Sequence, residues 1–215
     1  MYTHVIFDLD GTLLNTIDDL ADAGNHVCAA HGWPTHTVEE YKLMVGNGIP
    51  KLVSRFAPAG LGEEALANAL AEFSVYYGQH KEDKTAPYVG VPQTVDRVKA
   101  AGVTVAVLSN KAHALAGPVV EHYYPGVFAA VQGALPGVPA KPDPTLLHRL
   151  MEELEAKPET TLFVGDSDVD ILTGKNGGLS TCGVLWGFRS RRELEQAGAG
   201  YIIETPEQLV ELILD

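Results

Sequence analysis

The sequence predicts an α/β protein built on a doubly wound parallel sheet, with a small all-helical domain inserted near its start. The apolar run from Val5 to Phe7 indicates a first buried strand. Residues 15–84 then show helical apolar spacing without a strand pattern. After Pro87, short apolar strands alternate with helical stretches, which is typical of βαβ units in a parallel sheet.

The insert divides into helical stretches separated by glycine- and proline-rich breaks. Apolar residues recur at helical spacing in 17–30, 38–44, 49–56 and 63–77. The pattern therefore predicts a helical cap over 15–84. It predicts an α/β core formed by 1–14 and 85–215, with boundaries good to a few residues.

The second part of the chain supplies the remaining elements of the core. Buried strands are predicted at 103–108, 127–132, 161–164, 180–185 and 201–203. Helices are predicted at 92–101, 112–122, 144–154, 169–175, 191–197 and from residue 206. No internal repeat or low-complexity tract interrupts this alternation.

The composition is that of an ordinary globular chain with an acidic charge. Hydrophobic residues make up 46% of the 215 residues, and 15 basic against 28 acidic residues leave a net charge of −13. Nucleic-acid binders carry basic patches, so a nucleic-acid partner is not expected. A small phosphorylated molecule needs only a local positive site and fits this balance.

Neither a membrane partner nor export is expected. No segment approaches the ~18 apolar residues of a membrane-spanning helix, and the first residues lack the basic region of a signal peptide. Cys28 and Cys182 lie in apolar stretches without C-x-x-C spacing. This favours two reduced core thiols in a cytoplasmic protein, although a disulfide between them stays open.

The pentad Asp8-Leu9-Asp10-Gly11-Thr12 follows the first strand directly. Open α/β sheets bind their ligands at the carboxyl ends of the strands, which is where this pentad begins. Gly11 permits a sharp turn that exposes backbone N–H groups to an anion. Two carboxylates so close together repel each other unless a cation or a proton intervenes. The pentad alone can equally mark a turn, so the later strand ends decide its meaning.

Polar residues appear in three further places where chemistry is expected. Ser109 follows the strand at 103–108 and suits a phosphate oxygen or, more plainly, a helix cap. Lys141 lies between restricting prolines, where a solvated surface lysine is the ordinary alternative. Asp166 and Asp170 follow the strand at 161–164, where helix capping is common. Each signal alone is weak or moderate, but their order and placement are specific.

This order of motifs resembles the haloacid dehalogenase-like (HAD) superfamily over the whole chain. The pattern is Asp-x-Asp-Gly-Thr, then strand-Ser, then Lys-Pro, then strand-Gly-Asp-x-x-x-Asp. Within the superfamily, the chain is most similar to the phosphoglycolate phosphatase family. That likeness rests on Val45-Gly46-Asn47-Gly48 with Arg55, on Tyr88-Val89-Gly90-Val91, and on the stretch 139–144. It implies a Rossmann-like core, a helical cap and phosphatase activity on a small phosphomonoester.

The resemblance also implies a role for each motif. Asp8 would be the nucleophile that forms an aspartyl-phosphate, and Asp10 the general acid and base. Ser109 and Lys141 would stabilise charge on the transferring phosphoryl group. Mg²⁺ is the implied cofactor. Its implied site residues are Asp8, Asp10 through its backbone carbonyl, Asp166 and, through water or Lys141, Asp170. The implied substrate-binding residues are Gly11, Thr12, Asn110, Gly46, Asn47 and Gly48.

Other activities of the same superfamily stay open at this point. A sugar-phosphate mutase of the beta-phosphoglucomutase kind shares Asp8 and Asp10, but Ile49 stands where an arginine directly after Gly48 would favour it. A pyrophosphatase of the same superfamily is a further open alternative. A dehalogenase is disfavoured, because attack on a carbon–halogen bond has no use for Asp10. We expect a small phosphorylated metabolite as the partner and a monomer or weak homodimer.

Overall fold

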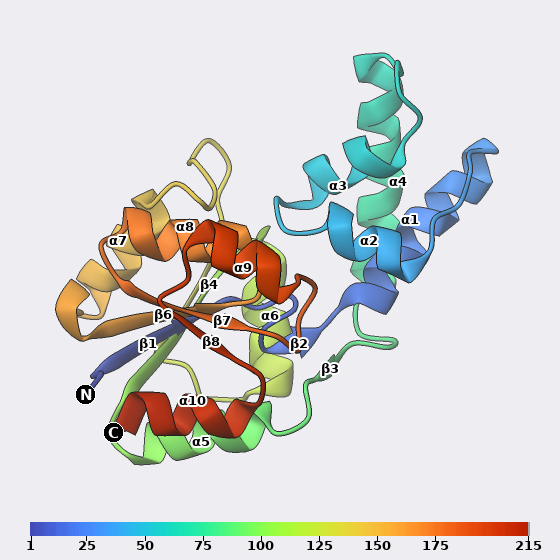
Figure 1. The fold of residues 1–215 in the computed structure, drawn as a ribbon. Coiled ribbons are helices and arrows are strands. Elements are labelled where there is room, and N and C mark those ends of the chain that lie inside the picture. The colour runs from blue at the N-terminus through green and yellow to red at the C-terminus, as the bar shows by residue number, and fades with distance from the viewer. Residues whose placement is uncertain (215) are drawn as a thin grey trace.

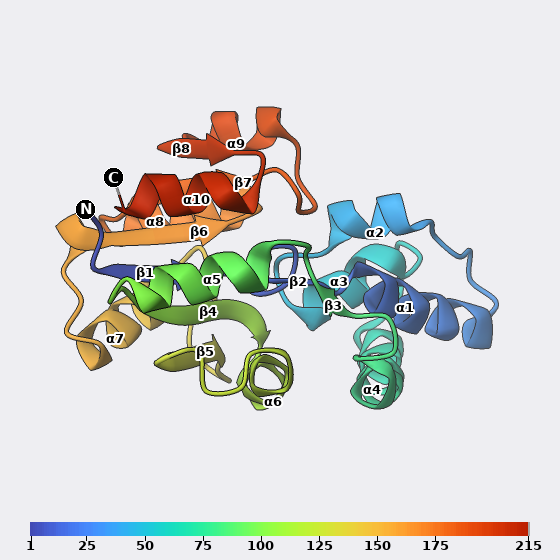
Figure 2. The ribbon, with the colours of Figure 1, turned by 90° about the horizontal axis from the view of Figure 1, so that it is seen from below.

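The structure, a computed structural model, describes residues 1–214 and contains one six-stranded sheet. The strands run in the order β5-β4-β1-β6-β7-β8, and every neighbouring pair is parallel (Figures 1 and 2). Their bounds are β1 His4–Phe7, β4 Thr104–Ala112, β5 Ala130–Ala134, β6 Thr161–Gly165, β7 Ser180–Val184 and β8 Tyr201–Ile203. The predicted fold class, a doubly wound parallel α/β sheet with helices around it, is confirmed.

Helices cover both faces of this sheet. One face carries α5 (Val91–Ala100), α6 (His113–Tyr123) and α10 (Pro206–Leu214). The other carries α7 (Thr145–Glu153) and α8 (Asp168–Asn176), with α9 (Arg191–Ala197) packed beside α8 and a short 3₁₀ turn at Pro158–Thr160. In β1, Val5 and Phe7 face the first layer while Ile6 faces the second. Burial on both faces explains the continuous apolar runs of these strands.

The insert folds into four helices that lie to one side of the sheet (Figure 2). They are α1 (Ile17–His31), α2 (Val38–Met44), α3 (Ile49–Phe56) and α4 (Glu63–His80). Their apolar faces form a core of their own around Tyr41, Phe73 and Tyr77. Among the residues that the structure describes, Leu115 and Phe188 pack against this cluster from the α/β part of the chain.

A small antiparallel ladder joins the two parts of the chain. It pairs β2 (Leu14–Asn15) with β3 (Ala86–Pro87), which brings the entry and the exit of the insert together. Strands of two residues are too short to show a period-two pattern, so the sequence does not predict them. The division into a core of 1–14 and 85–215 and a cap of 15–84 stays a prediction, which places both boundaries beside this ladder.

One strand is longer than the sequence suggests. Strand β4 continues through the polar residues Ser109 to Lys111, and its pairing with β5 shifts register between Leu108 and Ala112. Helix α6 begins only at His113, so the alternative that Ser109 caps a helix is wrong. The polar residues at the end of β4 interrupt the apolar run from which the strand was predicted. The sequence therefore places the end of this strand too early.

None of the helices in the described part of the chain is both long and apolar enough to cross a membrane.

Candidate active site

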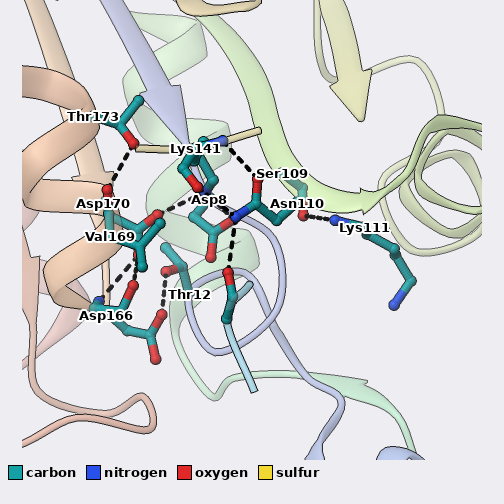
Figure 3. Close-up of polar contacts among 12 residues, drawn as sticks. Asp8, Thr12, Ser109, Asn110, Lys111, Lys141, Asp166, Val169, Asp170 and Thr173 are labelled. Carbon is teal, nitrogen blue, oxygen red and sulfur yellow. Dashed lines mark hydrogen bonds and ion pairs between the residues drawn. The ribbon is translucent and has the colours of Figure 1, made fainter. Parts of the chain in front are cut away.

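Three of the sequence motifs meet because their strands are neighbours in the sheet. Strand β1 lies between β4 and β6. Asp8 follows β1, Ser109 belongs to the last part of β4, and Asp166 follows β6. The carboxyl ends of parallel strands share one edge, so these side chains converge there (Figure 3).

Lys141 reaches this edge from the loop before α7 and is buried at the centre of an ionic cluster. Its Nζ lies 2.7 Å from Asp8 Oδ1 and 2.7 Å from Asp170 Oδ1. Burial alone would lower the pKa of Lys141, but the charges of Asp170 and Asp8 raise it above its usual value. The ammonium therefore stays charged and fixes one oxygen of each carboxylate.

The acidic residues are packed closely enough to hold a cation. Asp8, Asp166 and Asp170 are all buried, and each offers a carboxylate oxygen within 4.8 Å of the others. Burial and the charges of Asp170 and Asp166 raise the pKa of Asp8, although Lys141 opposes them. Burial and Asp170 likewise raise the pKa of Asp166 to about 7. One lysine does not offset this crowding, and hard carboxylate oxygens are the ligands that Mg²⁺ prefers, so the donor set fits such an ion.

The three carboxylates are engaged to different degrees. Asp170 uses Oδ1 for Lys141, and its Oδ2 accepts hydrogen bonds from both the backbone N–H and the hydroxyl of Ser167. Asp166 Oδ2 accepts from the backbone N–H of Phe188 at 2.7 Å, and its Oδ1 lies 3.5 Å from the hydroxyl of Thr12. Asp170 is thus largely satisfied by protein donors, whereas Asp8 and Asp166 keep more capacity for a cation.

Glycines allow the chain to pass this close to Asp166. Gly11 has φ +95°, and a Cβ there would lie 2.4 Å from Asp166 Oδ2. Gly187, in the loop after β7, would place a Cβ 2.2 Å from Asp166 Cβ. Only glycine fits at either position without moving Asp166, so both help to set where its carboxylate lies.

Asn110 connects three segments through one side-chain amide. Its Nδ2 donates to the carbonyl of Gly46 in the cap loop at 2.9 Å and to the carbonyl of Lys141 at 3.1 Å. Its Oδ1 accepts from the backbone N–H of Lys141 at 2.9 Å. The side chain therefore holds the Lys141 loop in place and ties it to the loop between α2 and α3.

A pocket opens from the reactive residues toward the cap. Asp8, Asp10, Ser109 and Asn110 line its floor, and Gly46 and Gly48 line it from the cap loop. Leu20, Val45, Ile49 and Leu52 supply apolar walls. The side chain of Asn47 turns elsewhere, because its Oδ1 accepts from Arg55 Nη2 at 2.7 Å. The structure thus brings Gly46 and Gly48, but not the Asn47 side chain, to the pocket.

A family model described as haloacid dehalogenase-like hydrolase matches residues 5–184. The chain belongs to this family. Curated phosphoglycolate phosphatases from Vibrio parahaemolyticus and Vibrio vulnificus are 30% and 31% identical to it. The alignments cover 97% and 98% of this chain and 95% of each relative. The crystal structure of a predicted phosphoglycolate phosphatase from Haemophilus somnus superposes with a TM-score of 0.90 at 26% identity, over 98% of this chain and 97% of that one.

The suspected resemblance to the HAD superfamily and to phosphoglycolate phosphatases is therefore confirmed. A solved protein from Lactobacillus delbrueckii subsp. bulgaricus, provisionally named a phosphoglycolate phosphatase, agrees with a TM-score of 0.93 at 31% identity. It covers 99% of this chain and 98% of that one. The chain is an enzyme, a HAD phosphatase, which implies a small phosphorylated substrate.

Three side chains of this HAD phosphatase reach the site without having been singled out from the sequence. Lys111 Nζ lies 3.0 Å from Asp10 Oδ1 and donates to the hydroxyl of Tyr77 at 2.7 Å. Arg189 donates to the carbonyls of Lys42 and Val45 in the cap. Lys111 follows directly after Ser109 and Asn110, so its place in the sequence could have identified it as a site residue. Tyr77 and Arg189 lie far away in sequence, and only the tertiary fold brings them near.

Proposed function

We propose that this enzyme hydrolyses a small phosphomonoester, with phosphoglycolate as the best single candidate, through an aspartyl-phosphate on Asp8 and with Mg²⁺ as cofactor. One observation carries the proposal. Asp8 is held through Oδ1 by Lys141, beside two further buried carboxylates, and borders a pocket that the helical insert covers. Relatives named phosphoglycolate phosphatase at 30% and 31% identity support the choice of substrate.

The first step is attack on phosphorus by Asp8. Its Oδ1 is engaged by Lys141, while Oδ2 has no hydrogen-bond partner among residues 1–214 and is available as the nucleophile. An Asp8 Oδ2–P bond forms as the bond between phosphorus and the ester oxygen breaks. Lys141 and the Ser109 hydroxyl stabilise the charge on the phosphoryl oxygens during this transfer.

Asp10 handles the protons of both half-reactions. It gives a proton to the ester oxygen as that oxygen leaves. It then takes a proton from the water that attacks the aspartyl-phosphate, which regenerates the Asp8 carboxylate and releases phosphate. Asp10 is partly exposed to the pocket, with 16% of its side chain accessible, which suits a group that must meet both the substrate and a water.

The carboxylates of Asp8 and Asp166, together with the backbone carbonyl of Asp10, would hold Mg²⁺. When bound, the ion neutralises the crowded carboxylates and shields the charge of the phosphoryl group. Asp170 contributes indirectly, by holding Lys141 through Oδ1. Ser167 in turn fixes Asp170 through two hydrogen bonds to Oδ2.

The pocket wall disfavours the sugar-phosphate mutase alternative. Leu20, Ile49 and Leu52 present apolar surface where a sugar would need donors and acceptors for its hydroxyls. Hydrolysis of a short, compact ester needs no such partners. Pyrophosphate is equally compact, so pyrophosphatase activity is retained as a competing outcome of the test below.

We also infer that the enzyme works in a reducing compartment such as the cytoplasm, as a monomer or weak homodimer. Cys28 and Cys182 are both free and buried, in different hydrophobic clusters. Burial raises the pKa of both thiols, which keeps them protonated and unreactive.

A panel of phosphate esters with Mg²⁺ tests the proposed function. We expect phosphoglycolate and other two- to six-carbon phosphomonoesters to be hydrolysed, with activity lost in excess EDTA and restored by Mg²⁺. Ca²⁺ should substitute poorly, because its looser coordination misplaces the attacking carboxylate. Full turnover in excess EDTA, or turnover of pyrophosphate alone, would contradict the proposal.

A further inference from the structure

Lys111 is a buried cation for which the proposed reaction has no assigned use. Only 3% of its side chain is exposed. Its ammonium forms an ion pair with Asp10, in which Nζ lies 3.0 Å from Oδ1. A charged ammonium is costly to bury, so its retention at this position calls for a reason.

Its hydrogen bonding is incomplete. A lysine ammonium carries three N–H donors. Within residues 1–214, the structure assigns partners to two of them, Asp10 Oδ1 at 3.0 Å and the Tyr77 hydroxyl at 2.7 Å. The aromatic ring of Tyr77 also lies beneath the ammonium, 4.9 Å from Nζ to the ring centroid. One donor of a buried cation is thus left for another acceptor.

The position of Lys111 points to the part of the substrate that does not react. Lys111 lines the same pocket as Asp8, and it is the one cationic residue among the described residues that line it. Figure 3 shows its side chain extending away from Asp8 and Lys141, which serve the phosphoryl group. The walls of this pocket are otherwise apolar, at Leu20, Val45, Ile49 and Leu52. A second polar group on the substrate would therefore bind at Lys111.

We propose that Lys111 Nζ binds a carboxylate on the substrate, and that this contact makes the enzyme prefer phosphomonoesters whose carboxylate lies one or two carbons from the ester oxygen. The inference rests on the proposed phosphatase function and specifies its substrate class. The carboxylate accepts a hydrogen bond from the third N–H of the ammonium, and its charge balances the cation while Asp10 carries the proton that it gives to the ester oxygen. Charge-assisted hydrogen bonds of this kind are the strong ones in a water-poor site.

Tyr77 acts as the positioning residue for this contact. It belongs to α4 in the helical insert, whereas Lys111 belongs to β4 of the sheet. Its hydroxyl and its ring restrict where the ammonium can lie. The carboxylate of the substrate would therefore be recognised only where the cap and the sheet are together, which couples substrate choice to a closed cap.

A matched pair of substrates tests this role. Phosphoglycolate and 2-hydroxyethyl phosphate have the same chain length, but the second carries a neutral alcohol in place of the carboxylate. We expect the wild-type enzyme to favour phosphoglycolate in kcat/KM. Lys111→Met should lower the ratio of the two kcat/KM values by at least about tenfold, because it removes a charged hydrogen-bond donor. Lys51→Met, which changes an exposed lysine on α3, is the control and should leave the ratio unchanged.

Tyr77→Phe gives a second readout. Loss of its hydroxyl should raise KM for phosphoglycolate more than for 2-hydroxyethyl phosphate, with a smaller effect on kcat. A merely structural role for Tyr77 would change both substrates alike.

Several outcomes would overturn the inference while leaving the proposed function standing. One is a wild-type enzyme that hydrolyses both esters equally well, a result that needs no variant to fold. Another is a ratio that Lys111→Met leaves unchanged. A preference for pyrophosphate over phosphoglycolate that Lys111→Met abolishes would assign the contact to a second phosphate instead. Failure of both esters to react at all would count against the proposed phosphatase function itself.

Discussion

The two oxygens of Asp8 have different surroundings, and this difference leads to a first prediction. Lys141 holds Oδ1, while Oδ2 has no partner in the described part of the chain. In Asp8→Asn, an amide replaces the carboxylate and cannot attack phosphorus to form the aspartyl-phosphate. We expect kcat to fall to background, because the change removes a group that acts in the transition state. Steady-state kinetics with saturating phosphomonoester would measure the loss.

Asp168→Asn is the matched control for this substitution. Asp168 belongs to the same acidic segment as Asp166 and Asp170, but its side chain is exposed. It should keep activity close to that of the wild type. Circular dichroism should show both variants folded. A near-normal kcat in Asp8→Asn would assign the nucleophile to another residue.

We expect the protonation of Asp166 to make binding of the proposed Mg²⁺ depend on pH. Burial and the charge of Asp170 raise the pKa of Asp166 to about 7, whereas an aspartate in the unfolded chain titrates near its ordinary value of about 3.9. Between these values, the metal-free folded protein keeps a proton that the unfolded chain has released. Its stability should therefore decrease as pH rises through this window.

Mg²⁺ must displace that same proton to bind Asp166. Its affinity should increase by about 30-fold between about pH 5.5 and about pH 8, as expected for release of one proton with a pKa of about 7. Calorimetric titration at several pH values would measure this. Asp166→Asn should bind weakly at every pH. An affinity that does not change with pH in the wild type would show that Asp166 is already ionised without metal.

At the scale of single elements, two helical glycines of the insert have opposite surroundings. A Cβ at Gly24 in α1 would lie 2.2 Å from the hydroxyl of Tyr41 on α2, while a Cβ at Gly78 in α4 would meet nothing within 4 Å. Gly24→Ala should cost about 1–3 kcal/mol of the free energy of unfolding through overpacking. Gly78→Ala should add about 0.5–1 kcal/mol, because alanine loses less backbone entropy in a helix.

Urea unfolding of the two glycine variants would compare these changes directly. Both introduce the same methyl group into a helix of the insert, so helix propensity contributes equally to each. The difference between them reports the close approach of α1 and α2 at Tyr41. If Gly24→Ala were stabilised as much as Gly78→Ala, that approach would be looser than the structure has it.

At the scale of the whole molecule, a few polar contacts join the insert to the sheet. Arg189, in the loop before α9, donates to the carbonyl of Lys42 and, at 2.7 Å, to that of Val45 at the end of α2. A cation is favourable at the carboxyl end of a helix, where carbonyl groups lack partners. Asn110 adds the bond to Gly46 from the sheet. These contacts hold the cap loop over the pocket.

Arg189→Ala should weaken this closed arrangement. We expect kcat/KM to fall by about tenfold at saturating Mg²⁺, mainly through a higher KM, because less of the protein is competent to bind substrate. Arg191→Ala removes a neighbouring arginine whose ion pairs are exposed, and it should change little. Equal effects of the two variants would show that Arg189 has no special part in closing the cap.

Local hydrophobic patterns were enough to predict most strands and helices of this enzyme from its sequence. Apolar runs that are buried on both faces, such as Val5 to Phe7, identified the strands, and helical spacing identified the insert. The sequence placed Asp8, Ser109 and Asp166 at or near the carboxyl ends of strands, and the resemblance to the HAD superfamily implied that they act together. The limits of β4 differed, because it continues through Ser109 to Ala112 and the polar side chains break the apolar pattern. The two-residue strands β2 and β3 were not predicted at all.

Contacts between distant segments were decided only by the tertiary structure. The sequence shows Lys111 beside Asn110, yet it does not show that Tyr77, 34 positions earlier, accepts a hydrogen bond from its ammonium. It also does not show that Arg189 reaches a helix end 144 positions away, at Val45. The hydrophobic pattern of a sequence indicates which face of a helix or strand is buried. It carries no information on which distant side chain will meet it, because that depends on how the insert packs against the sheet.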